Sequence, residues 1–303
     1  MTTSNDTALA YGIAPSGYRL PNATHIGRVR LQVADLRRSI AYYESVIGLR
    51  VIDRTATVAT LAAHGDDAVL VELHEKSGVR AVSRRGNIGL YHFAILLPDR
   101  PSLGRFVRHL AERGVYAGMS DHFVSEAVYL QDPDGLGIEV YADRPRSSWR
   151  AVDRQLAMAT EPLDVNNLLA ETGDATWSGA PAGTRIGHVH LHVRDIDQAA
   201  AFYHDGLGLD KVVWNYPGAL FLSAGGYHHH LGTNTWAAGA PDATEDDARL
   251  IEWEIVVPDV ASVGAVGQSL EKGGFTVARD GDDVVVRDPW GTQLRVVASS
   301  SER

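Results

Sequence analysis

A six-residue segment occurs twice in this chain, 160 residues apart, and this repeat constrains the fold more than any other feature. Ile26–Leu31 recurs as Ile186–Leu191, with the pattern Ile-Gly-x-Val-x-Leu in both copies. The same spacing holds downstream, where Leu97–Asp99 corresponds to Val257–Asp259. Self-similarity at a fixed period indicates a tandem duplication, so the two halves are expected to share one fold.

Each half contains two rounds of strand, helix and further strands. Residues 29–33 alternate like a strand, Asp35 stands at an N-cap position, and the helix predicted over 36–46 ends at Gly48. A second round has a strand at 90–97 and a helix at 102–113. We expect domains at 22–143 and 185–300, joined by a connector at 144–184 that is helical within 156–169. The first twenty residues are predicted to form a tail or arm.

Composition excludes several classes of function. The net charge of −10 over 303 residues argues against nucleic-acid binding, because phosphates require a basic surface. The absence of a long apolar span and of a signal-peptide pattern predicts a cytoplasmic protein with no membrane association. There are no cysteines, so any metal would be held by histidine and carboxylate side chains.

Two polar residues in apolar strands of the second module indicate a site. Asp132–Gly135 reads as a turn between strands, and Glu139 follows in the strand after it. His92 lies in the apolar segment Leu90–Leu97. Taken singly, the histidine would be a satisfied core residue and the glutamate a solvent-facing one. Together in one module they favour metal binding.

The modules, His92, Tyr129 and the turn leading to Glu139 resemble the vicinal oxygen chelate superfamily (glyoxalase/bleomycin resistance/extradiol dioxygenase), and within it the two-domain catechol-2,3-dioxygenase-like proteins. The segments Leu90–Pro98 and Phe221–His230 support the resemblance, which covers nearly all of residues 26–297. It implies an α+β fold of four βαβββ modules in two tandem domains. Curved mixed sheets would form a cup around a divalent metal.

The resemblance implies one candidate metal set in each half. In the second half the ligand positions fall on His188, His230 and Glu252, two imidazoles and one carboxylate, which is the facial set of non-haem Fe(II) enzymes. This set is the preferred one. Arg295 occupies the remaining ligand position there.

In the first half the second candidate set is His92, Glu139 and Glu72. Arg28 stands where the family pattern has histidine, and a cation cannot ligate a metal. Arg28 is expected to pair with Glu72 or Glu139, which would leave that cup without metal.

The resemblance also implies catalytic roles. His228 or His122 would transfer a proton, and Tyr129 would donate its hydroxyl to a substrate oxygen. We expect an extradiol-type dioxygenase that cleaves a catechol-like diol with O2, using Fe(II), with Mn(II), Zn(II) or Ni(II) as alternatives. Its partners would be a small aromatic substrate and O2, and a homo-oligomer is possible.

Two other functions remain open at this stage. One is an isomerase or lyase of the same superfamily, for which the carboxylates Glu72 and Glu139 would be suited. The other is a metal-free binding protein in which Arg28 and Arg295 read an anionic ligand.

Overall fold

The computed structural model describes residues 11–83 and 85–299. Four βαβββ modules follow one another along the chain, as predicted, and the fold is α+β. The first two modules consist of β1 (His25–Val33), α1 (Leu36–Tyr42) continued by the π-helical η1 (Tyr43–Ile47), β2 (Arg50–Arg54), β3 (Val58–Ala62) and β4 (Val71–Glu75), then β5 (Gly89–Leu96), α2 (Arg100–Glu112), β6 (Gly118–Asp121), β7 (Ser125–Gln131) and β8 (Gly137–Asp143).

The last two modules repeat this plan. They consist of β12 (Arg185–His192), α4 (Ile196–Ala199) continued by the π-helical η3 (Ala200–Gly206), β13 (Asp210–Val213), β14 (Ala219–Ser223) and β15 (Leu231–Asn234), then β16 (Arg249–Val257), α5 (Val260–Lys272), β17 (Val277–Asp280), β18 (Asp283–Arg287) and β19 (Gln293–Ala298).

The connector contains η2 (Arg146–Ser148), the short strands β9 (Ala151–Val152), β10 (Gln155–Leu156) and β11 (Glu161–Pro162), and the helix α3 (Val165–Ala170). The helix predicted within 156–169 is therefore shorter than expected and starts later. Its N-cap is Asp164, whose carboxylate accepts from the Asn167 backbone.

Each module begins its helix with the same local device. Asp35, Asp99, Asp195 and Asp259 are N-caps, and each carboxylate accepts a hydrogen bond from the backbone N–H three residues later. An aspartate cap satisfies one of the unpaired donors of the first helical turn. Because the caps stand at equivalent positions of the repeat, every helix starts directly after its cap, within a few residues of the end of the preceding strand.

The modules assemble into two mixed sheets, and each sheet takes one module from each half. The eight-stranded sheet has the order β17-β18-β19-β16-β1-β4-β3-β2, and the nine-stranded sheet has the order β11-β6-β7-β8-β5-β12-β15-β14-β13. The central pairs, β1 with β16 and β5 with β12, are antiparallel. The two halves are thus joined by strand pairing in both sheets.

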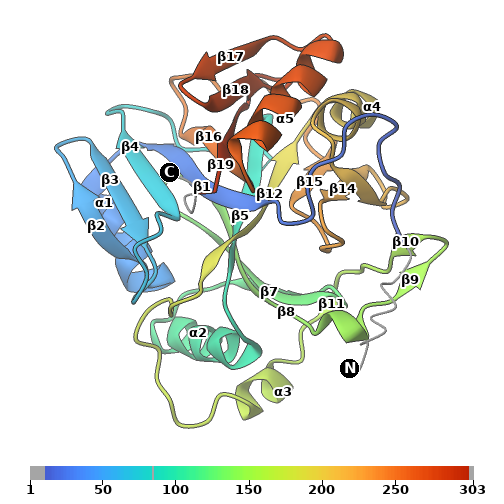
Figure 1. Ribbon diagram of the computed structural model, residues 1–303. Coiled ribbons are helices and arrows are strands. Elements are labelled where there is room, and N and C mark those ends of the chain that lie inside the picture. The colour runs from blue at the N-terminus through green and yellow to red at the C-terminus, as the bar shows by residue number, and fades with distance from the viewer. Residues whose placement is uncertain (1–10, 84, 300–303) are drawn as a thin grey trace.

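The two sheets are covered on their outer sides by helices. Figure 1 shows α5 at the top, packed on β16, β18 and β19, and α2 at the bottom, packed on β8. β1 also contacts β12 between the sheets, and the buried apolar residues of both sheets form one main cluster. Within the described ranges, no helix is both long and apolar enough to span a bilayer.

Candidate metal centre

The central strands of the nine-stranded sheet bring three predicted ligands onto one face. Ala94 in β5 has His188 of β12 as its neighbour on one side and Glu139 of β8 on the other. His92 precedes Ala94 by two residues and therefore lies on the same face, since side chains alternate along a strand. The small methyl group of Ala94 leaves the space between His188 and Glu139 open.

A glycine in β12, directly before His188, allows this strand to pack closely at the site. The register between β12 and β5 shifts between Ile186 and His188, which places Gly187 at the irregularity. A Cβ atom on Gly187 would lie 1.8 Å from the hydroxyl oxygen of Tyr141. Only glycine fits here. Packing against Tyr141 therefore explains the glycine at the second position of the repeated segment, directly before the candidate ligand His188.

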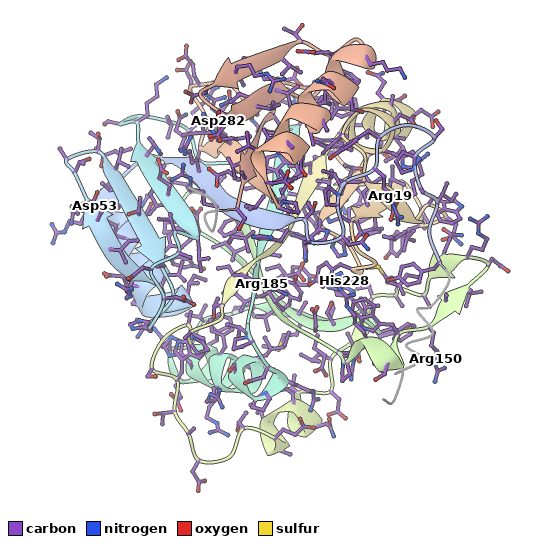
Figure 2. All side chains as sticks on the ribbon, viewed as in Figure 1. Arg19, Asp53, Arg150, Arg185, His228 and Asp282 are labelled. Carbon is purple, nitrogen blue, oxygen red and sulfur yellow. The ribbon has the colours of Figure 1, made fainter. Side chains whose placement is uncertain are left out.

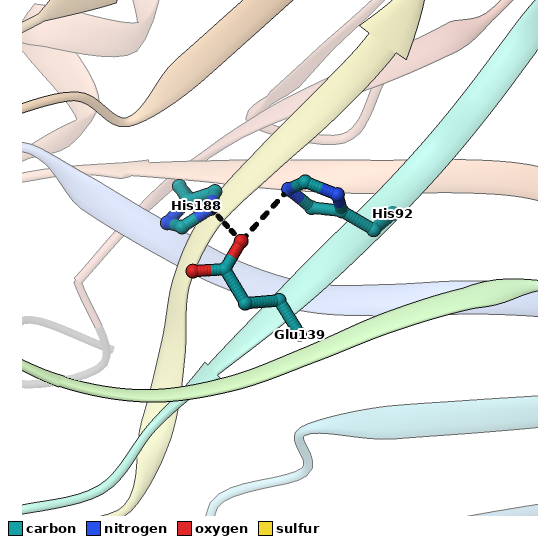
Figure 3. A group of neighbouring side chains, drawn as sticks. All are labelled: His92, Glu139 and His188. Atoms are coloured by element: carbon teal, nitrogen blue, oxygen red, sulfur yellow. Dashed lines mark hydrogen bonds and ion pairs between the residues drawn. The ribbon is translucent and has the colours of Figure 1, made fainter. Parts of the chain in front are cut away.

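The three side chains converge on one point. The Nε2 atoms of His92 and His188 lie 3.0 and 3.2 Å from the same oxygen, Oε2 of Glu139. One potential ligand atom from each residue lies within 4.8 Å of the other two. Figure 3 shows the carboxylate between the two imidazole rings. The side chains are buried, with residue exposures of 5, 1 and 2 % for His92, His188 and Glu139.

The chemistry of this group fits a divalent metal ion. Burial lowers the pKa of His188 to about 4, so its imidazole is neutral at pH 7 and has a free lone pair. The Nε2 of His92 is buried and lies against Oε2 of Glu139. Among the ion pairs of the described residues, Glu139 has no Lys or Arg partner. A buried carboxylate without a cation is costly, and a bound metal would supply the missing charge.

A cavity of about 660 Å³ reaches this group from outside. His92 and Glu139 line it, while His188 lies behind them, its ring centroid 4.1 Å from that of the cavity-lining His229. The walls carry six aromatic side chains: Tyr91, Tyr116, Tyr129, Tyr216, Phe221 and Trp236. The cavity is thus suited to a planar, apolar ligand with polar groups at one end.

Two predicted catalytic residues, His122 and Tyr129, line the same cavity and contact each other. Nδ1 of His122 lies 2.6 Å from the carbonyl oxygen of Ala159, so this nitrogen carries the proton and donates it. Nε2 lies 2.5 Å from the hydroxyl of Tyr129 and accepts from it. Burial raises the pKa of Tyr129 well above 10, which keeps the phenol protonated as a donor.

The preferred set of the second half is not brought together. Glu252 lies in β16 of the other sheet, where it accepts hydrogen bonds from Arg30, Arg295 and Gln293. Glu252 lies in the other sheet because β16 pairs with β1, whereas β12, which carries His188, pairs with β5. Of that set, only His188 belongs to the converging group, and it does so with His92 and Glu139 from the first half.

The histidines 228–230 lie in the loop before β15 and not in a strand. Nδ1 of His230 accepts from the backbone N–H of Ala224 at 3.1 Å. His228 is in the interior of the molecule (Figure 2), with Nε2 2.9 Å from Oδ1 of Asp143 and Nδ1 2.7 Å from Nδ1 of His229. Because His228 does not line the cavity, His229 is the residue of this run that faces it.

The predicted pairing of Arg28 with Glu72 is found. Nη1 of Arg28 lies 3.3 Å from Oε2 of Glu72, and Arg30 lies 3.2 Å from the same oxygen. Glu72 also accepts from His74, and all these residues belong to the eight-stranded sheet. Glu72 is therefore not part of the group that contains His92 and Glu139, and ion pairs fill the corresponding face of this sheet.

Three site residues were not assigned from the sequence. His190 and His192 follow His188 on the same face of β12 and line the cavity, and Asn234 of β15, outside the lining, contacts both. The side-chain amide of Asn234 contacts Nε2 of His190 at 2.9 Å and Nδ1 of His192 at 2.7 Å. The alternating histidines of β12 are the sequence signal that could have found His190 and His192. That pattern indicates a polar strand face, but it does not identify Asn234 of β15 as their hydrogen-bonding partner.

Comparison with known proteins adds the family. The sequence model described as the Glyoxalase/Bleomycin resistance protein/Dioxygenase superfamily matches residues 25–140 and 185–296. The chain is 44% identical over 271 residues to Catechol-2,3-dioxygenase from Bacillus subtilis (strain 168), covering 88% of this chain and 94% of that protein.

Solved structures show the same fold at low identity. A Bacillus subtilis protein assigned as a dioxygenase superimposes with a TM-score of 0.64 at 16% identity, covering 93% of this chain and 87% of the other. Glyoxalase I from Zea mays superimposes with a TM-score of 0.56 at 19% identity, covering 90% and 92%. These two similarities concern the fold alone.

Proposed function

The chain belongs to the glyoxalase/bleomycin resistance protein/dioxygenase superfamily, and within it we propose a metal-dependent extradiol-type dioxygenase that cleaves a catechol-like diol with O2. The observation that carries the proposal is the convergence of His92, His188 and Glu139 beside an aromatic cavity. Two imidazoles and one carboxylate form the facial set of non-haem Fe(II) oxygenases, which leaves positions open for substrate and O2. The 44% identity to Catechol-2,3-dioxygenase supports the same reaction.

In this proposal the metal is Fe(II), held by Nε2 of His92, Nε2 of His188 and a carboxylate oxygen of Glu139. When bound, Fe(II) would supply Lewis acidity toward the diol oxygens and a site for O2. The protein contributes two imidazoles, of which His188 is neutral because burial lowers its pKa to about 4, and the dry surroundings in which a carboxylate and a divalent cation attract each other strongly.

The cavity residues bind and orient the ring. Tyr91 lies against His92, with ring centroids 4.8 Å apart, and Trp236 lies edge-on to Tyr91 at 5.8 Å. Aromatic rings prefer offset or edge-to-face contact with one another, so these side chains favour a planar ring packed against them in the cavity. These walls hold the diol end toward Glu139 and exclude water from it.

His122 transfers the proton of a substrate hydroxyl, and Tyr129 donates a hydrogen bond to the substrate. The hydrogen bond from Nδ1 to Ala159 fixes the tautomer of His122, so that Nε2 is the basic nitrogen and faces the cavity. This nitrogen takes a proton from a substrate hydroxyl and returns it to the product. The phenol of Tyr129 then donates its hydrogen bond to a substrate oxygen.

The two alternative functions have less support. The isomerase or lyase alternative was based on Glu72 and Glu139 in one cup, and these lie in different sheets. The binding-protein alternative required Arg28 and Arg295 to read an anion. Both guanidinium groups are engaged with carboxylates, Arg28 with Glu72 and Glu254, and Arg295 with Glu252.

The test is the iron content of protein purified without oxygen, together with O2 uptake on addition of catechol. The variants are His92→Ala, His188→Ala and Glu139→Gln, with the exposed His25→Ala as a matched control. We expect about one equivalent of iron in the wild type and the control, and loss of both iron and O2 uptake in the three variants. Turnover of a diol or keto substrate without O2 uptake would instead support the isomerase, and wild type that takes up no metal would support a binding protein.

A further inference from the structure

The segment between β4 and β5 borders the cavity and is fixed at both ends. Val82, Ser83, Arg85, Gly86 and Asn87 line the cavity. The backbone N–H of Val82 donates to the carbonyl of Asp134 at 2.8 Å, and that of Ile88 to Pro241 at 2.8 Å. These hydrogen bonds join the segment to the turn before Glu139 and to the loop before β16.

The turn before Glu139 is built to admit this segment. Gly135 has φ +84°, and a Cβ atom there would lie 1.9 Å from the carbonyl oxygen of Val82. Glycine is required both by the left-handed backbone and by the close approach. The position of Val82 beside this turn is therefore specified by the fold.

Arg85 is the one Lys or Arg among the described residues that line the cavity. It has no ion pair or hydrogen bond among them, whereas Arg28, Arg30 and Arg295 in the other sheet are all paired. Its backbone has φ +57°, a conformation that costs free energy for a residue with a Cβ atom. Such a backbone persists where the surrounding structure fixes it, and these sites are often functional.

Arg85 also lies on the wall that leads to the metal group. Its positive charge is one of the causes, after burial, that lower the pKa of His192. The ring of His192 lies 4.7 Å from that of Tyr91, which in turn lies 4.8 Å from His92. A ligand with its diol at His92 and Glu139 can therefore extend along Tyr91 toward a guanidinium group.

The size of the cavity leaves room for such an extension. Its volume of about 660 Å³ is in the range that encloses drug-sized ligands, ~300–1,000 Å³, so a single ring would fill only part of it. An unpaired guanidinium prefers a carboxylate, to which it donates two parallel hydrogen bonds. With a net charge of −10 the protein as a whole repels anions, so an anionic substrate needs a local cation.

We propose that Arg85 binds an anionic substituent of the substrate, and that the substrate class is a catechol whose side chain ends in a carboxylate. This proposal rests on the proposed dioxygenase function, since it places the diol at His92 and Glu139. Arg85 acts in it as a specificity residue on the cavity wall.

The test measures equilibrium binding to the iron-loaded protein without O2, by calorimetry. The probes are 3,4-dihydroxyphenylacetate and its methyl ester, which differ in charge but keep the same ring and diol. We expect the wild type to bind the acid about tenfold more tightly, the gain typical of one hydrogen-bonded charge, with a smaller difference at high salt. Arg85→Gln should remove the difference, Arg85→Lys should keep part of it, and Arg54→Gln, an exposed arginine in β2 of the other sheet, should leave it unchanged.

Two results overturn the proposal and are distinguishable. If the wild type binds and cleaves both probes equally well, or Arg85→Gln keeps the preference for the acid, Arg85 does not read the substituent and the dioxygenase function stands. If neither probe binds the iron-loaded wild type, the proposed function fails, and the assignment of Arg85 fails with it.

Discussion

Glu252→Gln should lower the free energy of unfolding without changing the iron content, because Glu252 and the candidate metal ligands lie in different sheets. The Glu252 residue is 1 % exposed and is held by Arg30, Arg295 and Gln293. Removing one partner of a buried ion pair costs ~3–5 kcal/mol when the other charge is left alone. Here Arg30 keeps Glu72 at 3.2 Å and Arg295 keeps Asp280 at 2.9 Å, so we expect a loss near the lower limit, about 3 kcal/mol.

The assay is urea unfolding followed by tryptophan fluorescence, since Trp253 is buried next to Glu252 in β16. With a slope of ~3 kcal/mol per molar urea, the midpoint of Glu252→Gln should fall by about 1 M. The iron content of the folded variant should equal that of the wild type, while Glu139→Gln should lose its iron. A folded Glu252→Gln protein that loses one equivalent of iron would refute this reasoning and return Glu252 to the ligand set with His188 and His230.

Three further predictions follow from single contacts. Tyr129→Phe should retain iron but lower kcat by about 10²-fold, because one donor to the substrate oxygen is lost, and an unchanged kcat would exclude that role. Hydrogen bonding from His74 is the main cause that lowers the pKa of Glu72 to about 2 from 4.5, so ionised Glu72 stabilises the fold above pH 4.5 and this stabilisation is lost as the pH falls toward 2. The stability difference between wild type and Glu72→Gln should therefore shrink across that window, and a constant difference in pH-dependent melts would contradict the assignment. Gly135→Ala should lower the free energy of unfolding by ~2 kcal/mol or more, measured by urea unfolding, because its Cβ atom would strike the Val82 carbonyl in a left-handed backbone; a wild-type midpoint would show that the segment is not fixed there.

Local features of the fold were readable from the sequence because their causes are local. The Asp35 cap and the stop at Gly48, with φ +85°, depend on residues within one helix and its next turn. His122 and Tyr129 were singled out by the family resemblance and not by a local pattern. They belong to one hairpin, seven residues apart in the chain, and the structure places both in the cavity.

The repeat by itself determined that four equivalent modules exist, but it could not determine which modules share a sheet. The first strands of the modules, β1, β5, β12 and β16, are equivalent by sequence pattern, so alternation alone allows several pairings. The structure pairs β1 with β16 and β5 with β12, and this long-range choice decides which half supplies each ligand. Arg28 and Arg30 of β1 are half-buried cations that pair with the carboxylates of Glu254 and Glu252 in β16.

The same charge complementarity explains where a metal group can form. Once β1 and β16 form ion pairs with each other, the central strands of the other sheet carry histidines, His92 and His188, in place of the arginines of β1, so no guanidinium stands beside Glu139. Glu139 then lies between them without a protein cation. The sequence by itself determined the candidate ligand types, histidine and carboxylate, while only the tertiary pairing brought His92, Glu139 and His188 of the two halves together, because that depends on which charges find partners across the sheets.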